Sequence, residues 1–141
     1  MRPSAPPIGL RLFTAAKAVR RAFDEALASA GGSIPAWLVL TNLKAADWRS
    51  QHDLARAVGI EGPTLTRHLD ALERQGLVRR SPDASDRRAV VVELTPEGHA
   101  AHARLRDVVI AFDRRLRSGL TQEEVDVLRE LLGRLEANVN P

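Results

Sequence analysis

Hydrophobic residues recur every three or four positions along most of the chain, and this spacing predicts a mainly helical protein. Glycines, prolines and the expected N-capping residues Ser33, Ser50, Thr95 and Thr121 divide the pattern into segments. Two runs depart from helical spacing, because residues 77–80 and 89–94 are rich in branched side chains and predict a pair of β-strands. We expect helices over residues 9–30, 34–47, 51–58, 62–75, 96–117 and 122–139.

Residues 50–76 predict two short helices joined by a glycine turn. Ser50 is the expected N-cap of the first helix, and Gly59 ends it because glycine adopts a positive φ without steric cost. In the second helix Leu65, Leu69 and Leu72 follow at i, i+4 and i+7, which predicts one buried face. Threonine and arginine side chains near its start then face outward. This order is typical of a helix-turn-helix, whose second helix enters the major groove of DNA.

A charged hairpin follows directly. Turn-forming proline, serine and aspartate residues occupy positions 81–88 between the two predicted strands. Helix, turn, helix and hairpin together predict a winged helix, and Asp86 begins the charged tip of the wing. Arg79 and Arg80 alternate along the first strand, so only one of them is expected on the DNA side.

The positions of the charged residues support nucleic-acid binding, whereas the net charge of the chain does not. The net charge is +3, and residues 50–95 carry seven arginines and seven acidic residues, which cancel. Four of those arginines gather in the hairpin, where their field is local. The chain has no cysteine, which excludes disulfides, thiol redox sensing and cysteine-ligated metal and fits a cytoplasmic protein. Neither a membrane span nor a signal peptide is expected.

We expect a single domain over residues 10–141, preceded by a flexible proline-rich arm at residues 1–9. Residues 50–95 would form its DNA-binding lobe. The helices within 10–30 and 96–139 are longer than a small winged helix requires, so we expect another protein surface to pack against their apolar stripes. A two-fold partner is the simplest one, and it would set two recognition helices about one DNA turn apart, ~34 Å.

Two segments resemble the MarR family of bacterial transcription regulators, particularly its SlyA-like branch. They are GIEGPTLTRHLDALERQGLVRR at 59–80 and ASDRRAVVVELTPEG at 84–98, and the order of helices is similar from about residue 10 to 139. The SDRR wing tip followed by LTPEG is more specific than the helix-turn-helix alone. The resemblance implies a homodimer, here assigned as a repressor, that binds a palindromic operator in double-stranded DNA. The recognition helix 62–75 would lie in the major groove and the wing 81–89 in the minor groove, and a small aromatic or phenolic acid often relieves binding.

The recognition helix supplies the expected major-groove contacts. Thr64, Thr66 and Arg67 are the main candidates, because arginine bonds guanine bidentately and threonine can contact a phosphate or a thymine methyl group. Pro63 lies near the same surface. His68 is a further candidate for a DNA contact. Alternatively, it faces a ligand or solvent.

The wing and the supporting helix supply the remaining expected DNA contacts. Arg87 and Arg88 are expected at the minor groove, where a narrow groove attracts guanidinium groups. In the family's D-x-R pattern Asp86 would organise the wing and Arg88 would be the inserted residue. Ser50 and Gln51 begin the supporting helix, where backbone N–H groups can hold a phosphate, with plain capping as the alternative.

Trp37, on the second predicted helix, is the candidate for effector binding, because the resemblance implies a pocket in that region. Lys17 or Arg20 would pair with a ligand carboxylate, and Thr41 completes the candidate set. A core tryptophan packed under the first helix is the alternative for Trp37. Trp48 is the weaker candidate.

No motif in the sequence predicts an enzyme, and no cofactor is expected. Phosphate-binding glycine loops, nucleophile elbows and zinc-peptidase motifs are absent, and every glycine except Gly133 is assigned to a helix end or a turn. His99 and His102 are one helical turn apart without further ligands at suitable spacing, so no metal site is predicted. The alternative function is a winged-helix module that binds a protein partner without sequence-specific DNA binding. The arginines at positions 67, 87 and 88 argue against it.

Overall fold

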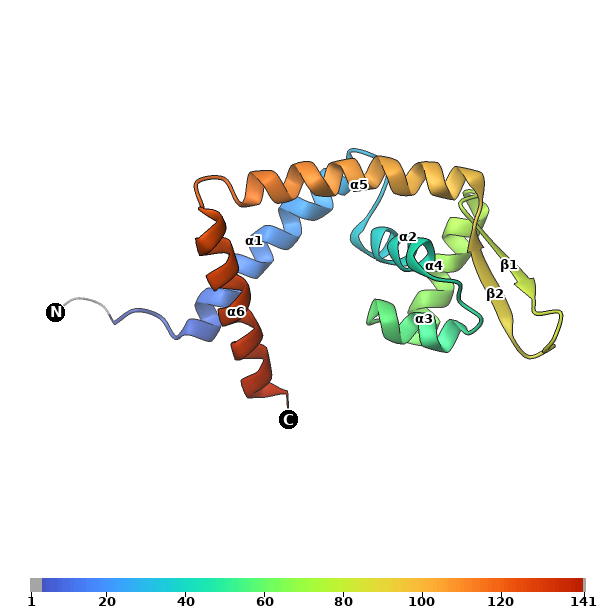
Figure 1. Cartoon of the computed structure of the whole chain (residues 1–141), viewed down its shortest axis with the longest axis horizontal. Helices are drawn as coiled ribbons and strands as arrows, with labels where there is room; N and C mark the ends of the chain where they lie inside the picture. Colours follow the sequence, from blue (N-terminus) through green and yellow to red (C-terminus); the bar gives the residue numbers. More distant parts are fainter. Residues whose placement is uncertain (1–3, 141) are drawn as a thin grey trace. The chain divides into compact units, whose positions relative to one another are not determined.

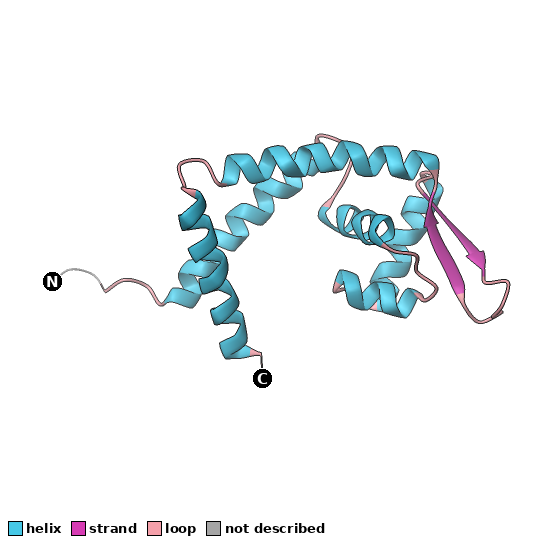
Figure 2. Ribbon diagram, in the orientation of Figure 1, coloured by secondary structure: helices cyan, strands magenta, loops and turns pink. Residues whose placement is uncertain are grey.

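Six helices and one antiparallel hairpin make up residues 4–140, which are the residues that the computed structural model describes. Figure 1 labels these elements, and Figure 2 shows the hairpin as the strand pair. Their bounds are α1 Ile8–Ala28, α2 Ile34–Ala45, α3 Gln51–Val58, α4 Gly62–Arg74, β1 Val78–Pro82, β2 Val90–Leu94, α5 Pro96–Leu116 and α6 Gln122–Val139. The mainly helical winged-helix architecture predicted from the sequence is therefore confirmed. The predicted arm at 1–9 lies in part outside the described residues, and Ile8 already belongs to α1.

Side-chain caps begin α2, α3, α5 and α6 where the sequence predicts them, with Thr95 as the cap of α5. The hydroxyl groups of Ser33 and Ser50 each accept a hydrogen bond from the amide three residues on, at 3.2 and 3.3 Å. Thr121 and Glu124 form a reciprocal capping box at the start of α6. These contacts satisfy N–H groups that a helix leaves unpaired in its first turn, so each fixes a helix start.

The chain divides into two compact units between Val109 and Ile110. In the first, buried aliphatic side chains of α2, α3, α4, the hairpin and α5 form one core, and Leu27 joins it from α1. Leu65, Leu69 and Leu72 are at most 3% exposed, which confirms the predicted buried face of α4. Gly59 adopts a φ of 82° between α3 and α4, as the helix-turn-helix requires.

The hairpin is anchored at its base and on one side. Val78 pairs with Leu94 and Pro82 with Val90, and the buried Val78 and Val92 enter the core. Trp48 adds a single bridge to the outer side of β2, where the Val92 amide donates to its carbonyl at 3.2 Å. Its indole N–H donates to the Asn42 carbonyl at 2.8 Å, so Trp48 ties the end of α2 to the sheet.

Gly98 corrects one sequence-based interpretation. It lies in the first turn of α5, which agrees with the predicted helix end, but a helix start does not explain why the residue is glycine. A Cβ at this position would collide with the backbone carbonyl oxygen of Leu77. Thr95 lies at the same junction, where its hydroxyl donates to the Gly76 carbonyl at 2.5 Å and accepts from the Gly98 amide at 3.0 Å. The start of α5 is thus packed directly on the turn after α4.

Large apolar side chains remain exposed on the terminal helices. Phe13 of α1 is 69% exposed, and Leu128 of α6 is 47% exposed. In the second unit, which holds the end of α5 and all of α6, Val125 is the buried residue of the α6 stripe. Within residues 4–140 no helix is long and apolar enough to cross a membrane.

Candidate nucleic-acid interface

The outward face of α4 carries the cationic side chain expected at the major groove. With Leu65, Leu69 and Leu72 buried, helical geometry turns Pro63 and Arg67 to the opposite face, and both are exposed. Among the described residues Arg67 has no ion-pair partner. The helix has no acidic side chain in its first turn and no side-chain cap, so its first N–H groups and the Arg67 guanidinium are available to an anion.

The two threonines of α4 differ in what they can donate. Both are half-buried beside the exposed face. Thr66 Oγ1 donates to the Gly62 carbonyl at 3.1 Å, so its proton is used within the helix. Thr66 therefore offers a partner a methyl group and lone pairs, whereas no hydrogen bond within the described residues occupies the Thr64 hydroxyl.

His68 lies on a different flank of α4 from Pro63 and Arg67. It lines a shallow depression with Ala71 and Gln75, facing the turn formed by Gly31 and Gly32. This placement follows from helical geometry, since one residue after Arg67 the side chain has turned by about 100°. The structure does not bring His68 together with the outward-facing candidates.

Short hydrogen bonds shape the wing tip and leave its arginines exposed. The Asp86 carboxylate accepts from the Arg88 amide at 2.9 Å, and the Asp86 carbonyl accepts from the Ala89 amide at 3.1 Å. Asp86 thus makes the contacts that a wing-organising residue requires. Both Arg87 and Arg88 are exposed, with no ion-pair partner in the described chain.

A second aspartate stabilises the other side of the tip. Asp83 accepts hydrogen bonds from the amide and the hydroxyl of Ser85, at 2.9 and 2.8 Å. These bonds, with a smaller contribution from the charge of Arg49, hold the pKa of Asp83 below its ordinary value. The Asp83 carboxylate therefore stays ionised, and able to accept these bonds, further into the acid range than an ordinary aspartate.

The start of α3 and the wing share one surface depression. Its lining includes Ser50 and Gln51 from the start of α3 together with Asp86 and Arg88 from the wing, and Arg49 adds a second guanidinium. The structure thus brings together residues that the sequence could only propose separately. The first N–H groups of a helix beside two arginines are suited to a phosphate.

Arg79 and Arg80 lie on opposite sides of β1, as their alternation predicts. The Arg79 side chain is 66% exposed and lies 3.4 Å from the Glu93 carboxylate across the hairpin. The Arg80 side chain is only 20% exposed, because it turns back to the carboxylates of Asp70 and Glu73 on α4. Neither carboxylate was anticipated as a partner from the sequence.

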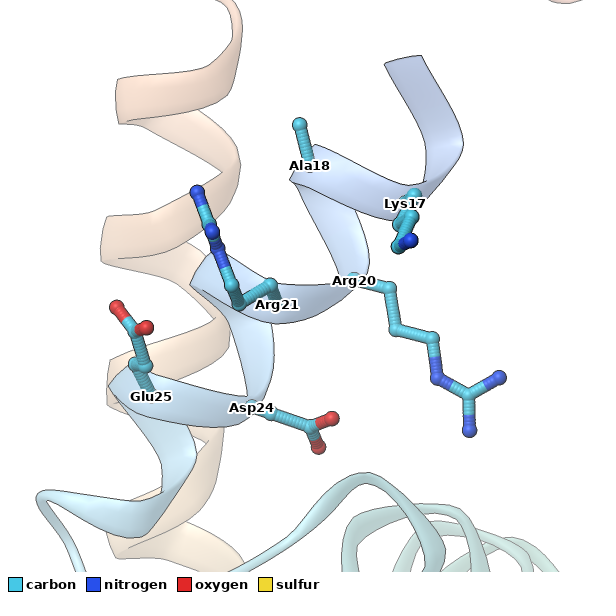
Figure 3. A pocket seen from close by; sticks show the side chains of 6 residues that line it. All are labelled: Lys17, Ala18, Arg20, Arg21, Asp24 and Glu25. Atoms are coloured by element: carbon cyan, nitrogen blue, oxygen red, sulfur yellow. The ribbon is translucent and has the colours of Figure 1, made fainter. Parts of the chain in front are cut away.

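The four candidate effector residues are not gathered in one pocket. Lys17 and Arg20 line a depression on α1 with Arg21, Asp24 and Glu25. Figure 3 shows Arg20 and Asp24 extending to one side of α1, and Arg21 and Glu25 to the other. The lining includes neither Trp37 nor Thr41.

Trp37 and Thr41 lie on α2, one helical turn apart. Trp37 is half-buried and stacks on His102 of α5, with ring centroids 5.1 Å apart and planes 15° apart. The Thr41 hydroxyl is buried and has no hydrogen-bond partner within the described chain. The ring contact of this tryptophan is thus with α5, and the alternative of packing under α1 is not what this contact shows.

The two histidines of α5 have separate neighbours. His99 Nδ1 lies 3.1 Å from the ammonium group of Lys44, and His102 contacts Trp37. Residues 4–140 contain no cluster of three His, Cys, Asp or Glu side chains suited to a metal.

Comparisons with known proteins agree with this geometry. Residues 33–90, which span α2 to the start of β2, match the MarR family. The chain is similar to CouR, a transcriptional repressor solved with a 23-mer DNA duplex, with 31% identity over 92% of each chain and a TM-score of 0.85. It is also similar to the transcriptional regulator PA3341, with 36% identity over 94% of this chain and 98% of that one and a TM-score of 0.77. A third similar structure is a mutant of MarR from E. coli complexed with operator DNA, with 28% identity, 92% and 93% coverage and a TM-score of 0.81.

Proposed function

The chain belongs to the MarR family of transcriptional regulators, and we propose that it acts as a homodimeric repressor on a palindromic operator in duplex DNA. The observation that carries this proposal is a pair of exposed arginines, one on α4 and one on the wing, that have no ion-pair partner within residues 4–140. Arg67 projects from α4 opposite its buried leucines, while Arg88 projects from the wing beside the start of α3. A recognition helix and a wing so equipped suit adjacent major and minor grooves. The SDRR wing tip and the LTPEG segment support placement in the SlyA-like branch. This role implies a cytoplasmic location, which stays a prediction.

The dimer is inferred from the apolar side chains that the terminal helices leave uncovered. Ile8, Leu10 and Phe13 on α1 are each more than half exposed, and α6 exposes Val127 and Leu131. Exposed apolar clusters of this kind mark association surfaces. A second copy of the chain covers them and supplies the second recognition helix that a palindrome requires.

Selection of bound duplexes from a random pool tests the operator proposal. The expected result is a two-fold symmetric motif with half-sites about one helical turn apart. If the chain instead retained a protein partner and enriched no duplex even at low salt, the result would favour the protein-interaction module. It would overturn the proposal.

We also propose that a small aromatic acid modulates binding through the region of Trp37. The buried, unpartnered hydroxyl of Thr41, one turn along the same helix, is the supporting observation, because such a group gains a hydrogen bond when a ligand carboxylate reaches it. A ligand that binds the DNA-free protein more tightly than the DNA-bound protein lowers the affinity for DNA by the ratio of its two affinities. Salicylate should quench the fluorescence of Trp48→Phe, which retains Trp37, but not that of Trp37→Phe. Quenching that survives in Trp37→Phe would contradict this site.

A further inference from the structure

Arg80 makes four polar contacts from β1 to α4. Its Nη2 lies 2.5 Å from Asp70 Oδ1 and 3.3 Å from Glu73 Oε1, and its Nε lies 3.3 Å from Glu73 Oε2. Its backbone amide donates to Glu73 Oε2 at 3.1 Å. We call this cluster of Arg80, Asp70 and Glu73 the Arg80 clamp. Within residues 4–140, the ion pairs of this cluster are the ones that join the hairpin to the recognition helix.

The clamp lies between the two surfaces assigned to DNA. Asp70 follows Arg67 by three residues on α4, so the two side chains are neighbours on one flank of the helix. Arg80 pairs across the hairpin with Val92, and its strand begins shortly after α4 ends at Arg74. A rotation of the hairpin about its base therefore changes the distance between the wing tip and Arg67.

Besides the clamp, the hairpin is held by side chains in the shared core and by the Trp48 bridge to Val92, and within residues 4–140 no other ion pair joins it to α4. Val78 and Val92 anchor its base in the core, while Pro82 and Val90 at the outer end are exposed. A two-stranded ribbon is only marginally stable alone. Hydrogen bonds from the Arg80 side chain and amide keep the pKa of Glu73 below its ordinary value, so the ionised form of Glu73 is the one that this contact favours.

We propose that Arg80 is a positioning residue, which fixes the wing relative to α4 so that Arg67 and Arg88 reach one duplex together. This inference rests on the proposed function. Without the clamp, the duplex must order the hairpin when it binds, and that ordering lowers affinity. The competing assignment is a direct contact between Arg80 and a phosphate, with Asp70 and Glu73 as incidental neighbours.

Neutralising the carboxylates separates these assignments by the sign of the effect. If Asp70 and Glu73 were incidental, D70N/E73Q would strengthen duplex binding, because two negative charges near the phosphates are removed. The clamp predicts the opposite, a loss of roughly fivefold to twentyfold, comparable to that of Arg80→Ala. The steepness of the salt dependence should be the same in Arg80→Ala as in the parent, since no phosphate contact is lost. A reduced slope with Arg80→Ala, or tighter binding by D70N/E73Q, would overturn the clamp.

The neighbouring pair provides matched controls on the same hairpin. Arg79 and Glu93 carry the same kinds of charge one position along each strand, but within residues 4–140 they form no ion pair with α4. Glu93→Gln should leave duplex affinity unchanged or slightly higher. Arg79→Ala should lower duplex affinity only as much as the removal of one positive surface charge does. Equal losses from Glu93→Gln and D70N/E73Q would mean that any hairpin charge has this effect, which would also refute the clamp.

Amide hydrogen exchange tests the clamp without DNA and so separates its failure from failure of the proposed function. Exchange in β1 and β2 should be at least about threefold faster in Arg80→Ala than in Arg79→Ala, with the α2 and α5 amides unchanged as evidence of folding. Equal exchange in the two variants would refute the clamp even if the parent binds its operator. Faster exchange in a protein that binds no duplex would refute the proposed function and leave the clamp as a structural contact.

Discussion

The indole ring of Trp37 stacks on the imidazole ring of His102, and this contact joins α2 to α5. The charged groups that shift the pKa of His102 are all cationic. Burial is the main cause that lowers its pKa from 6.5, and the charges of Lys44, Arg106 and His99 lower it further. The neutral ring is therefore the form that the fold selects.

This pairing predicts a fold that weakens in acid. The unfolded chain binds a proton at His102 near pH 6.5, whereas the folded chain does so only at lower pH. Stability from this residue is therefore complete above that value and falls as the pH drops through it toward the lower, folded pKa. Thermal unfolding between about pH 8 and pH 5 should show a smaller fall in midpoint for His102→Phe, which keeps an aromatic ring without a charge. An identical fall in parent and variant would contradict this assignment.

Gly98→Ala should be strongly destabilising. The added methyl group would collide with the backbone carbonyl oxygen of Leu77, which cannot move without disturbing the turn after α4. We expect a loss of about 2–4 kcal/mol in the free energy of unfolding, measured by denaturant titration. Gly133→Ala is the matched control, because a Cβ there meets nothing within 4 Å in this chain and alanine favours a helix by about 1 kcal/mol. Equal effects of the two substitutions would show that the close approach at Gly98 is unimportant.

Phe13→Ser should shift the protein from dimer to monomer without unfolding the lobe around α3 and α4. Phe13 is 69% exposed in the single chain, so its removal costs that chain little core packing. Burial of the ring by a partner would contribute about 1.5–3 kcal/mol per side, which the variant loses. Sedimentation equilibrium measures the shift, and Val90→Ser, 36% exposed on the hairpin, is the control. A variant with the dimer affinity of the parent would exclude this part of α1 from the interface.

Arg67→Ala and Arg88→Ala should both weaken operator binding, but in different ways. A bidentate contact of Arg67 to guanine would be worth about 1–3 kcal/mol at one base pair, so its loss relaxes specificity there. Arg88→Ala should weaken binding to every sequence with the same major-groove half-site, and more so where the flanking minor groove is narrow. Competition with single-base operator variants distinguishes the two patterns. If Arg67→Ala leaves the base preferences unchanged, its contact is not base-specific.

Features of the fold that depend on neighbouring residues could be predicted from the sequence. The caps at Ser33, Ser50 and Thr121 act over three residues, and the buried face of α4 follows from one helical period. Each is visible as a short pattern, so each was predicted correctly.

Features that depend on distant partners could not be predicted. Alternation placed Arg79 and Arg80 on opposite sides of β1 but did not indicate that Arg80 would form ion pairs with Asp70 and Glu73. Gly98 meets a carbonyl group 21 positions earlier in the chain, and Trp48 joins the sheet through a single bridge without any strand-like run around it. For Arg80, acidic residues at i and i+3 on the preceding helix were the signal that was available and missed.

One hydroxyl group, that of Thr95, holds the ends of three elements together. It accepts a hydrogen bond from the Gly98 amide in the first turn of α5 and donates one to the carbonyl of Gly76 after α4. Thr95 itself is the residue directly after β2. Tilting of the first turn of α5 therefore strains these bonds unless the end of α4 and the hairpin move with it. A shift of that turn would therefore be transmitted to both parts of the chain that we propose to contact DNA, through a single side chain.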